Sequence, residues 1–211
     1  MRKMGSTFIG AVLGAVVLLG VGSTAHALST TIGGATCASC FGSVYTLSVV
    51  DSGTANLWNV TYSVDTTNYS GQGSGLDAIA FKITDNSTNI LSTSITSQPA
   101  TFSDPLIVGG LSAGGCGSGP AGFICSQSST LGGLAVPNGT YEFKYGVTLA
   151  AGTLFGSVTD WSIKGLYVDS TGKQAGLTSE HGSVPVPGTS LLFGVGMALF
   201  AGWHRKFSRQ V

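Results

Sequence analysis

The chain has 211 residues, of which only 9% are charged, and its formal net charge is zero. Between residues 28 and 187 there are nine acidic residues and four lysines, a net charge of −5, and there is no arginine. Such a region has no basic patch that could neutralise phosphates, which excludes nucleic acid as a partner and argues against an anionic membrane surface. The two termini are apolar and account for much of the hydrophobic content.

The first 27 residues have the three parts of a secretory signal peptide. Arg2 and Lys3 precede an apolar run from Phe8 to Gly22, and the small-x-small motif of Ala25 and Ala27 follows. We expect the secretion translocon to export the chain and cleavage after Ala27 to leave Leu28 as the first residue. An uncleaved signal anchor is the alternative, which the short, glycine-rich apolar run disfavours.

The last 28 residues resemble a membrane segment with a basic stop. No charged residue occurs from 188 to 203, and Arg205, Lys206 and Arg209 follow. Basic flanks face the cytoplasm, so we expect the residues before 184 to lie outside the inner membrane. At 1.5 Å per residue the apolar helix is about 24 Å long, shorter than a hydrocarbon core of ~30 Å, so it would span only marginally.

The order of proline motif, apolar helix and basic cluster resembles the PEP-CTERM sorting signal, which exosortases process on exported proteins of Gram-negative bacteria. The motif here is Pro185, Val186, Pro187 and Gly188, followed by Leu191-Leu-Phe-Gly194. Val186 stands where the family has glutamate. The resemblance covers about the last 26 residues and implies a transient inner-membrane anchor, an exosortase-type processing enzyme, and a destination at the cell surface or in the matrix. A similar C-terminal segment occurs on some ice-binding proteins.

These segments divide the chain into five parts. We expect a signal peptide (1–27), a β domain (28–175), a tether with the sorting motif (176–187), a transmembrane helix (188–204) and a basic cytoplasmic tail (205–211).

The central region predicts an all-β fold. Residues 141–149 alternate apolar and polar side chains with period two, which a helix cannot match, and residues 58–64 and 77–85 do the same. Weaker strands are expected at 44–50, 90–96, 106–108, 154–158 and 161–168, the last with a bulge at Gly165, whereas 109–133 is glycine-rich and of low complexity. Turn signals separate the strands, and we predict an antiparallel β-sandwich, jelly-roll or immunoglobulin-like, of about seven to ten strands.

All four cysteines follow the signal peptide, and an even number in an oxidising compartment favours two disulfides. Three connectivities are possible, and we favour Cys37 with Cys40 and Cys116 with Cys125, because each pair lies in its own Gly/Ser-rich segment. Other functions of the Cys37-x-x-Cys40 motif are disfavoured. A redox dithiol would open a helix, and a zinc site would need a second half with similar spacing, but the sequence shows neither. Haem attachment would need histidine where Phe41 stands.

Catalytic motifs are weak. Ser112 lies in a Gly-x-Ser-x-Gly pattern, but the glycines that follow cannot form the helix that a hydrolase requires, and the histidine left for a triad is His181 in the tether. Glu142 lies on the polar face of a strand, so a glycosidase pair is disfavoured. A calcium site at Asp65, Asp85 or Asp169 is an alternative to ordinary Asx turns.

Carbohydrate binding is the functional alternative with the most physical content, because sugars stack on exposed aromatic rings. The candidate rings are Trp58, Trp161, Tyr167 and Tyr69. Both tryptophans lie on alternating apolar faces, which favours the core. Tyr69, flanked by Asn68 and Ser70 before a glycine run, is the expected exposed ring and sugar contact.

The leading hypothesis is an exported, non-enzymatic envelope or matrix protein associated with surface polysaccharide, with no cofactor and no metal. The alternative is a lectin-like β-sandwich module. A secreted hydrolase and an ice-binding protein are less favoured, the latter because ice binding requires regular Thr-x-Thr rows and the nearest run, residues 92–97, is short and irregular.

Overall fold

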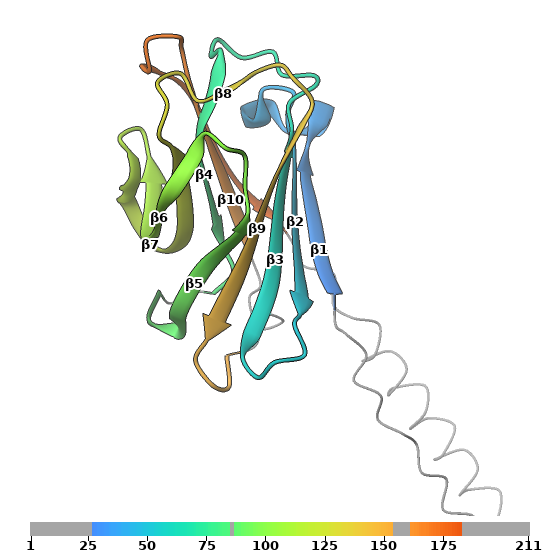
Figure 1. The fold of residues 1–211 in the computed structure, drawn as a ribbon. Helices are drawn as coiled ribbons and strands as arrows, with labels where there is room; N and C mark the ends of the chain where they lie inside the picture. The colour runs from blue at the N-terminus through green and yellow to red at the C-terminus, as the bar shows by residue number, and fades with distance from the viewer. Residues whose placement is uncertain (1–26, 85–86, 154–160, 183–211) are drawn as a thin grey trace, which may run out of the picture.

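The computed structural model describes residues 27–84, 87–153 and 161–182. Within these residues the chain is all-β, and its strands form two antiparallel sheets (Figure 1). The first sheet has the order β1 (Ala27–Gly33), β2 (Val44–Asp51), β3 (Leu57–Asp65), β9 (Thr140–Leu149) and β5 (Ile90–Ser97). The second has the order β11 (Gln174–Gly182), β10 (Trp161–Val168), β4 (Gly75–Lys82), β7 (Gly115–Ser128) and β6 (Phe102–Ser112), and β8 (Leu134–Ala135) also pairs with β4. Three 3-10 turns are η1 (Gly34–Thr36), η2 (Ala38–Cys40) and η3 (Ser87–Asn89).

One apolar core is built from the inner faces of both sheets. The period-two pattern places every second side chain of β2, β3 and β9 inward, and those side chains are buried, except Trp58 and Tyr141, which are partly buried against the core. Across the interface, the ring of Tyr62 stacks on that of Phe81 with centroids 5.9 Å apart, and the Tyr62 hydroxyl donates to the Lys164 carbonyl at 3.0 Å. The two sheets are therefore joined by ring packing and by polar contacts.

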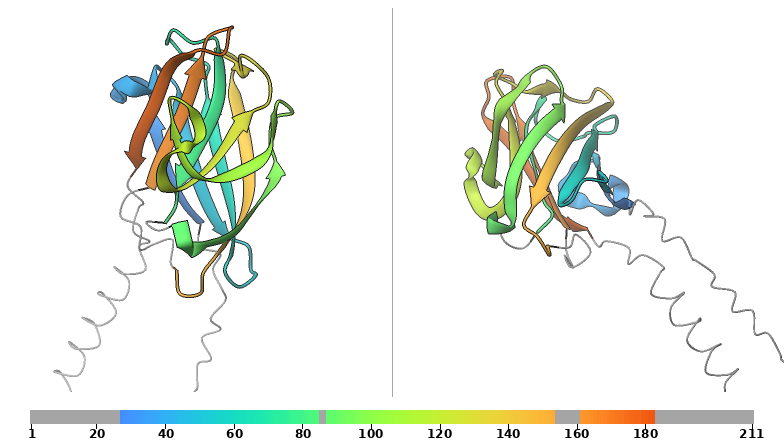
Figure 2. Two further views of the ribbon diagram at one scale, coloured as in Figure 1. Left: turned by 90° about the vertical axis from the view of Figure 1, so that its left-hand side faces the viewer. Right: turned by 60° about the horizontal axis from the view of Figure 1, so that its bottom comes forward.

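The β6–β7 hairpin covers the outer face of the second sheet. The disulfide between Cys116 and Cys125 brings their Cα atoms to 5.7 Å, whereas a straight strand would separate them by about 30 Å. β7 therefore folds back on itself, at Gly117 and Gly122, where φ is +85° and +94° and glycine is favoured. The tip of the hairpin lies over β10 (Figure 2), and a second apolar cluster fills the space beneath it.

Lys164 is buried in this second cluster. Its side chain is only 9% exposed, and its ammonium group donates to the Leu111 carbonyl at 3.2 Å and lies 4.6 Å from the centre of the Phe123 ring. Burial lowers the pKa of Lys164. Because residues above and below β10 cover it, all eight of its residues are buried, and period-two alternation is lost from this strand.

The strands expected at 44–50, 58–64, 90–96, 141–149 and 161–168 are present, and the strand expected at 77–85 is β4, which begins and ends earlier. Residues 106–108 fall in the longer β6, and residues 154–158 lie outside the described residues. The bulge predicted at Gly165 is wrong, because Gly165 pairs regularly with Ile79 and Thr178 and the register shifts fall beside Tyr167.

Two segments expected to be irregular are strands. The glycine-rich segment 109–133 contains the end of β6 and all of β7, because backbone pairing needs no apolar side chains. Residues 176–182 belong to β11 and not to a tether, since they pair with β10 along its whole length. The boundary predicted between domain and tether at residue 176 is therefore wrong.

The predicted terminal segments lie almost entirely outside the described residues. Ala25, the sorting motif, the apolar segment 188–204 and the basic tail are among these. Ala27 is exposed and Leu28 is buried, both in β1. Along the ranges 27–84, 87–153 and 161–182, no helix combines the length and the hydrophobicity needed to span a membrane.

Candidate functional site

An open pocket of about 510 Å³ lies between two loops at one end of the first sheet. One loop joins β1 to β2 and the other joins β3 to β4, so β1 runs toward the pocket from the opposite end (Figure 1). The volume is within the range of about 300–1,000 Å³ that is typical of small-molecule sites. The lining residues are Gly34, Ala35, Cys37, Ala38, Phe41, Gly42, Val44, Asn68 and Ser70.

A short series of tight turns shapes the first loop. The Cys37 amide donates to the Gly34 carbonyl at 3.3 Å, the Cys40 amide donates to the Cys37 carbonyl at 3.2 Å, and the Ser43 amide donates to the Cys40 carbonyl at 2.9 Å. The disulfide between Cys37 and Cys40 closes the central turn, with Cys40 fully buried and Cys37 half-buried in the pocket wall. The wall is therefore held by covalent and hydrogen-bonded contacts that are local in sequence.

The two loops touch through their backbones. The Ser70 amide donates to the Phe41 carbonyl at 2.8 Å. A Cβ atom on Gly42, where φ is +82°, would lie 2.1 Å from the Asn68 carbonyl oxygen, so only glycine permits this approach. The Phe-Gly dipeptide after Cys40 thus has a structural meaning: it lets the second wall of the pocket dock on the first.

Phe41 has an unusual backbone and a fixed ring. Its φ is +51°, in the left-handed region that costs a non-glycine residue about 1–2 kcal/mol. Its ring meets those of Tyr69 and Tyr167 edge-on, with centroids 6.3 Å and 6.1 Å away. The ring also covers Gly176, where a Cβ atom would come within 2.9 Å of it. Packing against these three residues fixes the ring of Phe41, a half-buried residue that lines the pocket.

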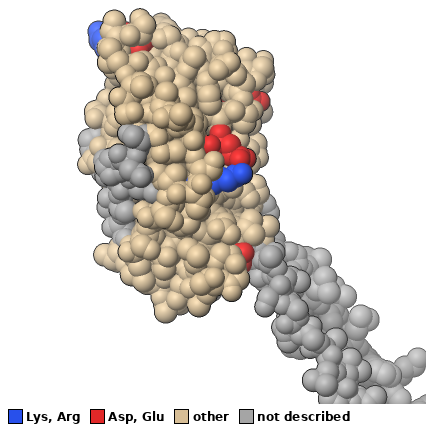
Figure 3. Space-filling model, viewed as in Figure 1, with Lys and Arg blue, Asp and Glu red and all other residues tan. Residues whose placement is uncertain are grey.

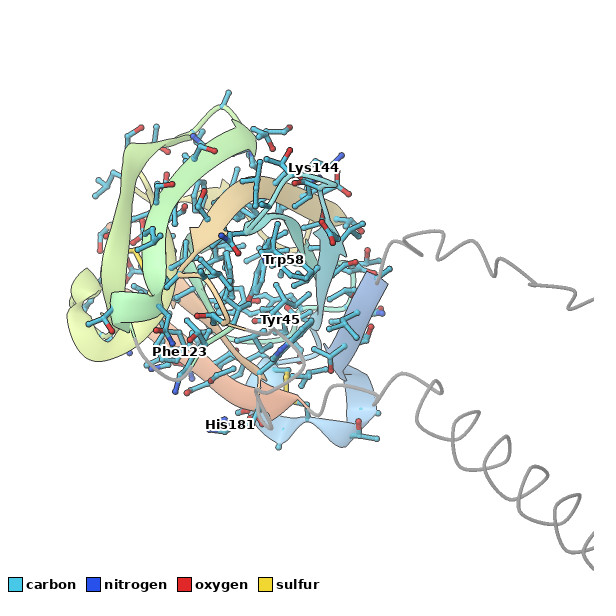
Figure 4. All side chains as sticks on the ribbon, turned by 90° about the horizontal axis from the view of Figure 1, so that it is seen from below. Tyr45, Trp58, Phe123, Lys144 and His181 are labelled. Atoms are coloured by element: carbon cyan, nitrogen blue, oxygen red, sulfur yellow. A yellow bond between two sulfur atoms is a disulfide. The ribbon has the colours of Figure 1, made fainter. Side chains whose placement is uncertain are left out.

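A buried hydroxyl network lies beneath the pocket and ties its first loop to three strands. The Tyr167 hydroxyl donates to Ser43 Oγ at 2.8 Å and lies 2.6 Å from the Tyr45 hydroxyl. The Tyr45 hydroxyl donates to Thr178 Oγ1 at 3.1 Å, and Thr178 Oγ1 donates to the Ser39 carbonyl at 2.9 Å. Figure 4 shows Tyr45 in the interior between the sheets.

Burial keeps these tyrosines protonated. It raises the pKa of Tyr45 and that of Tyr167, because a phenolate would lose its hydration in the core. Both side chains therefore remain hydrogen-bond donors at ordinary pH, and the network is a neutral scaffold.

The pocket itself is uncharged. None of its nine lining residues is Asp, Glu, Lys, Arg or His. Asn68 is exposed at its rim, and within the described residues no hydrogen bond engages its side-chain amide. The face seen in Figure 3 also carries few charged side chains. The pocket thus offers an aromatic ring, an amide and the hydroxyl of Ser70 to a neutral ligand.

Comparison of the chain with protein-family models, with characterised proteins and with solved structures finds no match. What this pocket does must therefore be argued from its own geometry.

The prediction that Tyr69 is an exposed sugar-stacking ring is wrong. Tyr69 is 7% exposed, and its ring stacks on Tyr167 with centroids 4.4 Å apart. The polar neighbours Asn68 and Ser70 are exposed as the sequence suggested, but the tyrosine between them turns inward. Trp161 is buried and Trp58 packs against the core, as predicted.

The aromatic residue that lines the pocket is Phe41, which sequence reasoning did not identify. Its only signal was its position between a Cys-x-x-Cys motif and a glycine.

Both predicted disulfides are present, which settles the connectivity as Cys37 with Cys40 and Cys116 with Cys125. The first pair lies in the β1–β2 loop that forms a wall of the pocket, and the second lies within β7, in the hairpin over β10.

The residues weighed for catalysis lie on separate strands. Ser112 is at the end of β6, and the chain turns there into β7, with no helix. Glu142 is exposed on β9 and its carboxylate pairs with the Lys144 ammonium at 2.7 Å. His181 is exposed on β11, at the periphery of the molecule in Figure 4.

The aspartates weighed as calcium ligands form Asx turns. Asp65 Oδ1 accepts from the Thr67 hydroxyl at 2.6 Å and amide at 2.9 Å, and Asp169 Oδ1 accepts from the same two groups of Thr171 at 2.6 Å and 2.8 Å. These bonds, led by those from the threonine hydroxyls, lower the pKa of both carboxyl groups. Asp85 lies outside the described residues.

Proposed function

We propose that this protein is exported from the cytoplasm of a Gram-negative bacterium and serves in the cell envelope or extracellular matrix without enzymatic activity. The observation that carries the proposal is the pairing of all four cysteines in two disulfides, which is typical of an oxidising, extracytoplasmic compartment. The signal-peptide pattern and the C-terminal resemblance to the PEP-CTERM signal agree with that destination.

The proposed route follows from the two termini. The signal peptide directs export and is removed after Ala27. The segment 188–204 holds the chain briefly in the inner membrane, with Arg205, Lys206 and Arg209 in the cytoplasm. An exosortase-type enzyme then cleaves at or near Pro185 to Pro187. The two sheets constitute a β-sandwich of jelly-roll or immunoglobulin-like kind, which is released or attached to surface polysaccharide.

Intact-mass spectrometry of the native protein tests this route. Culture medium and membranes are fractionated, free thiols are alkylated, and the protein is purified from each fraction. We expect the extracellular form to begin at Leu28, to end near Pro187 and to carry no alkylated cysteine. An extracellular form that still ends at Val211, or one with four alkylated thiols, contradicts the proposal.

A variant pair tests the sorting motif itself. In the double variant Pro185→Ala and Pro187→Ala we expect the chain to stay in the membrane fraction with Val211 intact. Gln210→Ala, in the tail, is the matched control and should be processed as the wild-type chain is. Equal release of the wild-type chain and both variants would show that the proline motif is not needed for processing.

Carbohydrate binding is the second candidate function, and the pocket favours it. An aromatic ring beside an amide and a hydroxyl, with no charged lining residue, is the combination that a sugar requires: an apolar face for its C–H surface and hydrogen-bonding groups for its hydroxyls.

A further inference from the structure

We infer that the pocket binds a neutral sugar unit of a longer polysaccharide, with Phe41 as the stacking surface and Asn68 and Ser70 as the hydrogen-bonding groups. This inference rests on carbohydrate binding as the second candidate function and names its ligand class and contacts.

The stacking surface is organised before a ligand arrives. The ring of Phe41 is held edge-on by Tyr69 and Tyr167 and lies over Gly176, so its position is set by the fold. The Cys37–Cys40 disulfide and the hydroxyl network fix the loop that carries it. Binding then requires little additional ordering of the protein, which is a main cost of association.

The polar groups match the hydroxyls of a sugar. The Asn68 amide provides two N–H donors and a carbonyl acceptor at the exposed rim. Ser70 Oγ donates to the Phe41 carbonyl at 3.3 Å, which leaves its lone pairs to accept from a ligand. Because a sugar hydroxyl both donates and accepts, neighbouring hydroxyls of one ring can engage both side chains.

The electrostatics favour a neutral sugar over an acidic one. The lining has no cation to pair with a carboxylate or sulfate, and the region between residues 28 and 187 carries a net charge of −5. A uronic acid in the pocket would lose hydration without gaining an ionic partner.

The shape and place of the pocket favour part of a polymer. The pocket is open, so a sugar unit can occupy it while the rest of the chain extends into solvent. β1 begins at the end opposite the first loop (Figure 1), whereas β11 passes beside that loop, where Thr178 and Glu180 contact Ser39.

Isothermal titration with the full-length protein in mild detergent tests the inference. The probes are β-1,4-linked and α-1,4-linked glucose tetrasaccharides, a β-1,4-linked mannose tetrasaccharide, and a mannuronic acid tetrasaccharide as the acidic counterpart. We expect saturable binding of at least one neutral probe and none of the acidic one.

Three variants locate the site. Phe41→Leu keeps a side chain over Gly176 and the same backbone requirement but removes the aromatic face, and should weaken binding about tenfold. Asn68→Ala changes only an exposed amide and should weaken it roughly threefold to tenfold. Asn59→Ala makes the same change on the outer face of β3, away from the pocket, and should bind as the wild type does. Thermal midpoints within a few degrees of wild type establish that each variant is folded.

Several results would overturn the inference. If no neutral probe gives saturable binding, or if only the acidic probe does, the proposed ligand class is wrong. If the folded variants Asn68→Ala and Phe41→Leu bind with unchanged affinity, or if only Asn59→Ala loses affinity, the proposed site is wrong. None of these results touches the export route, which is read independently from the masses of the N- and C-termini, so the two proposals fail separately.

Discussion

Removing one oxygen from the core tests whether the hydroxyl network holds the pocket loop. In Tyr167→Phe the ring and its stacking on Tyr69 remain, but the hydroxyl that donates to Ser43 Oγ at 2.8 Å and lies 2.6 Å from the Tyr45 hydroxyl is lost. Ser43 is fully buried, so water cannot readily replace the lost donor.

The expected cost can be worked from these contacts. Each buried hydrogen bond between neutral groups contributes about 1 kcal/mol. The variant loses two such contacts, and Ser43 Oγ is left without the donor that Tyr167 provides, which adds to the cost. We expect the free energy of unfolding to fall by roughly 2–3 kcal/mol. For a domain of this size that corresponds to a drop in Tm of roughly 4–12 °C. Tyr45 keeps Thr178 as a partner, which limits the loss.

Tyr145→Phe is the matched control. Tyr145 is equally buried, but its hydroxyl has one hydrogen bond in the described part of the chain, to Ser126 Oγ at 3.1 Å. The expected loss there is about 1 kcal/mol. Urea unfolding followed by tryptophan fluorescence measures both variants. If Tyr167→Phe costs no more than Tyr145→Phe, the network does not stabilise the loop and the reasoning fails.

The same tyrosines determine a pH dependence. Burial raises the pKa of Tyr45, Tyr62, Tyr145 and Tyr167 above the value of 10.0 that they have when exposed. Above pH 10 the unfolded chain loses protons that the folded chain retains, so stability is full below pH 10 and falls as pH rises beyond it. Tyr167→Phe should reduce this alkaline slope, because one such group is removed.

Two further variants follow from the same structure. The double variant Cys116→Ala and Cys125→Ala removes a disulfide with a sequence separation of nine residues. Its free energy of unfolding, measured by urea unfolding, should fall by roughly 2.5 kcal/mol in the chain-entropy treatment. An unchanged midpoint would show that the disulfide does not stabilise the hairpin. In the same assay, Gly42→Ala should lower the free energy of unfolding clearly more than Gly53→Ala does. Both glycines have positive φ, but only a Cβ on Gly42 would clash, at 2.1 Å from the Asn68 carbonyl oxygen. Equal losses would show that the contact between the two loops is unimportant for stability.

Sequence reasoning located the strands whose buried faces are apolar. β3 and β9 show the period-two pattern over their whole length, because one face packs on the core and the other meets solvent. It missed β1 and β11, each of which has a threonine at one inward position. Thr30 and Thr178 are both buried, and Thr178 is satisfied by Tyr45, a partner far away in the sequence. In the sequence, a threonine whose hydroxyl is buried cannot be distinguished from one that faces solvent, because its hydrogen-bond partner is not known.

The candidate site shows the same limit. The disulfides could be predicted because both are local, with sequence separations of three and nine residues. The orientation of Tyr69 could not, since its neighbours are polar and exposed and its inward turn depends on stacking with Tyr167 on β10. Nor could Phe41 be identified, because its ring packs against Gly176 on β11, a strand that was not expected.

The stabilising contacts of the first loop converge on residues 37–43, and this bears on function. Ordering a loop costs about 1–2 kcal/mol per residue, and a loop that only connects two strands can remain mobile. Here a disulfide, a clash-free glycine contact and a buried hydroxyl network all act on the segment that carries Phe41. Phe41 also adopts left-handed backbone, which persists only where surrounding contacts enforce it. A rigidly held aromatic residue in an uncharged pocket agrees with the proposed sugar site, since each contact with a sugar is small and little binding energy can be lost to ordering.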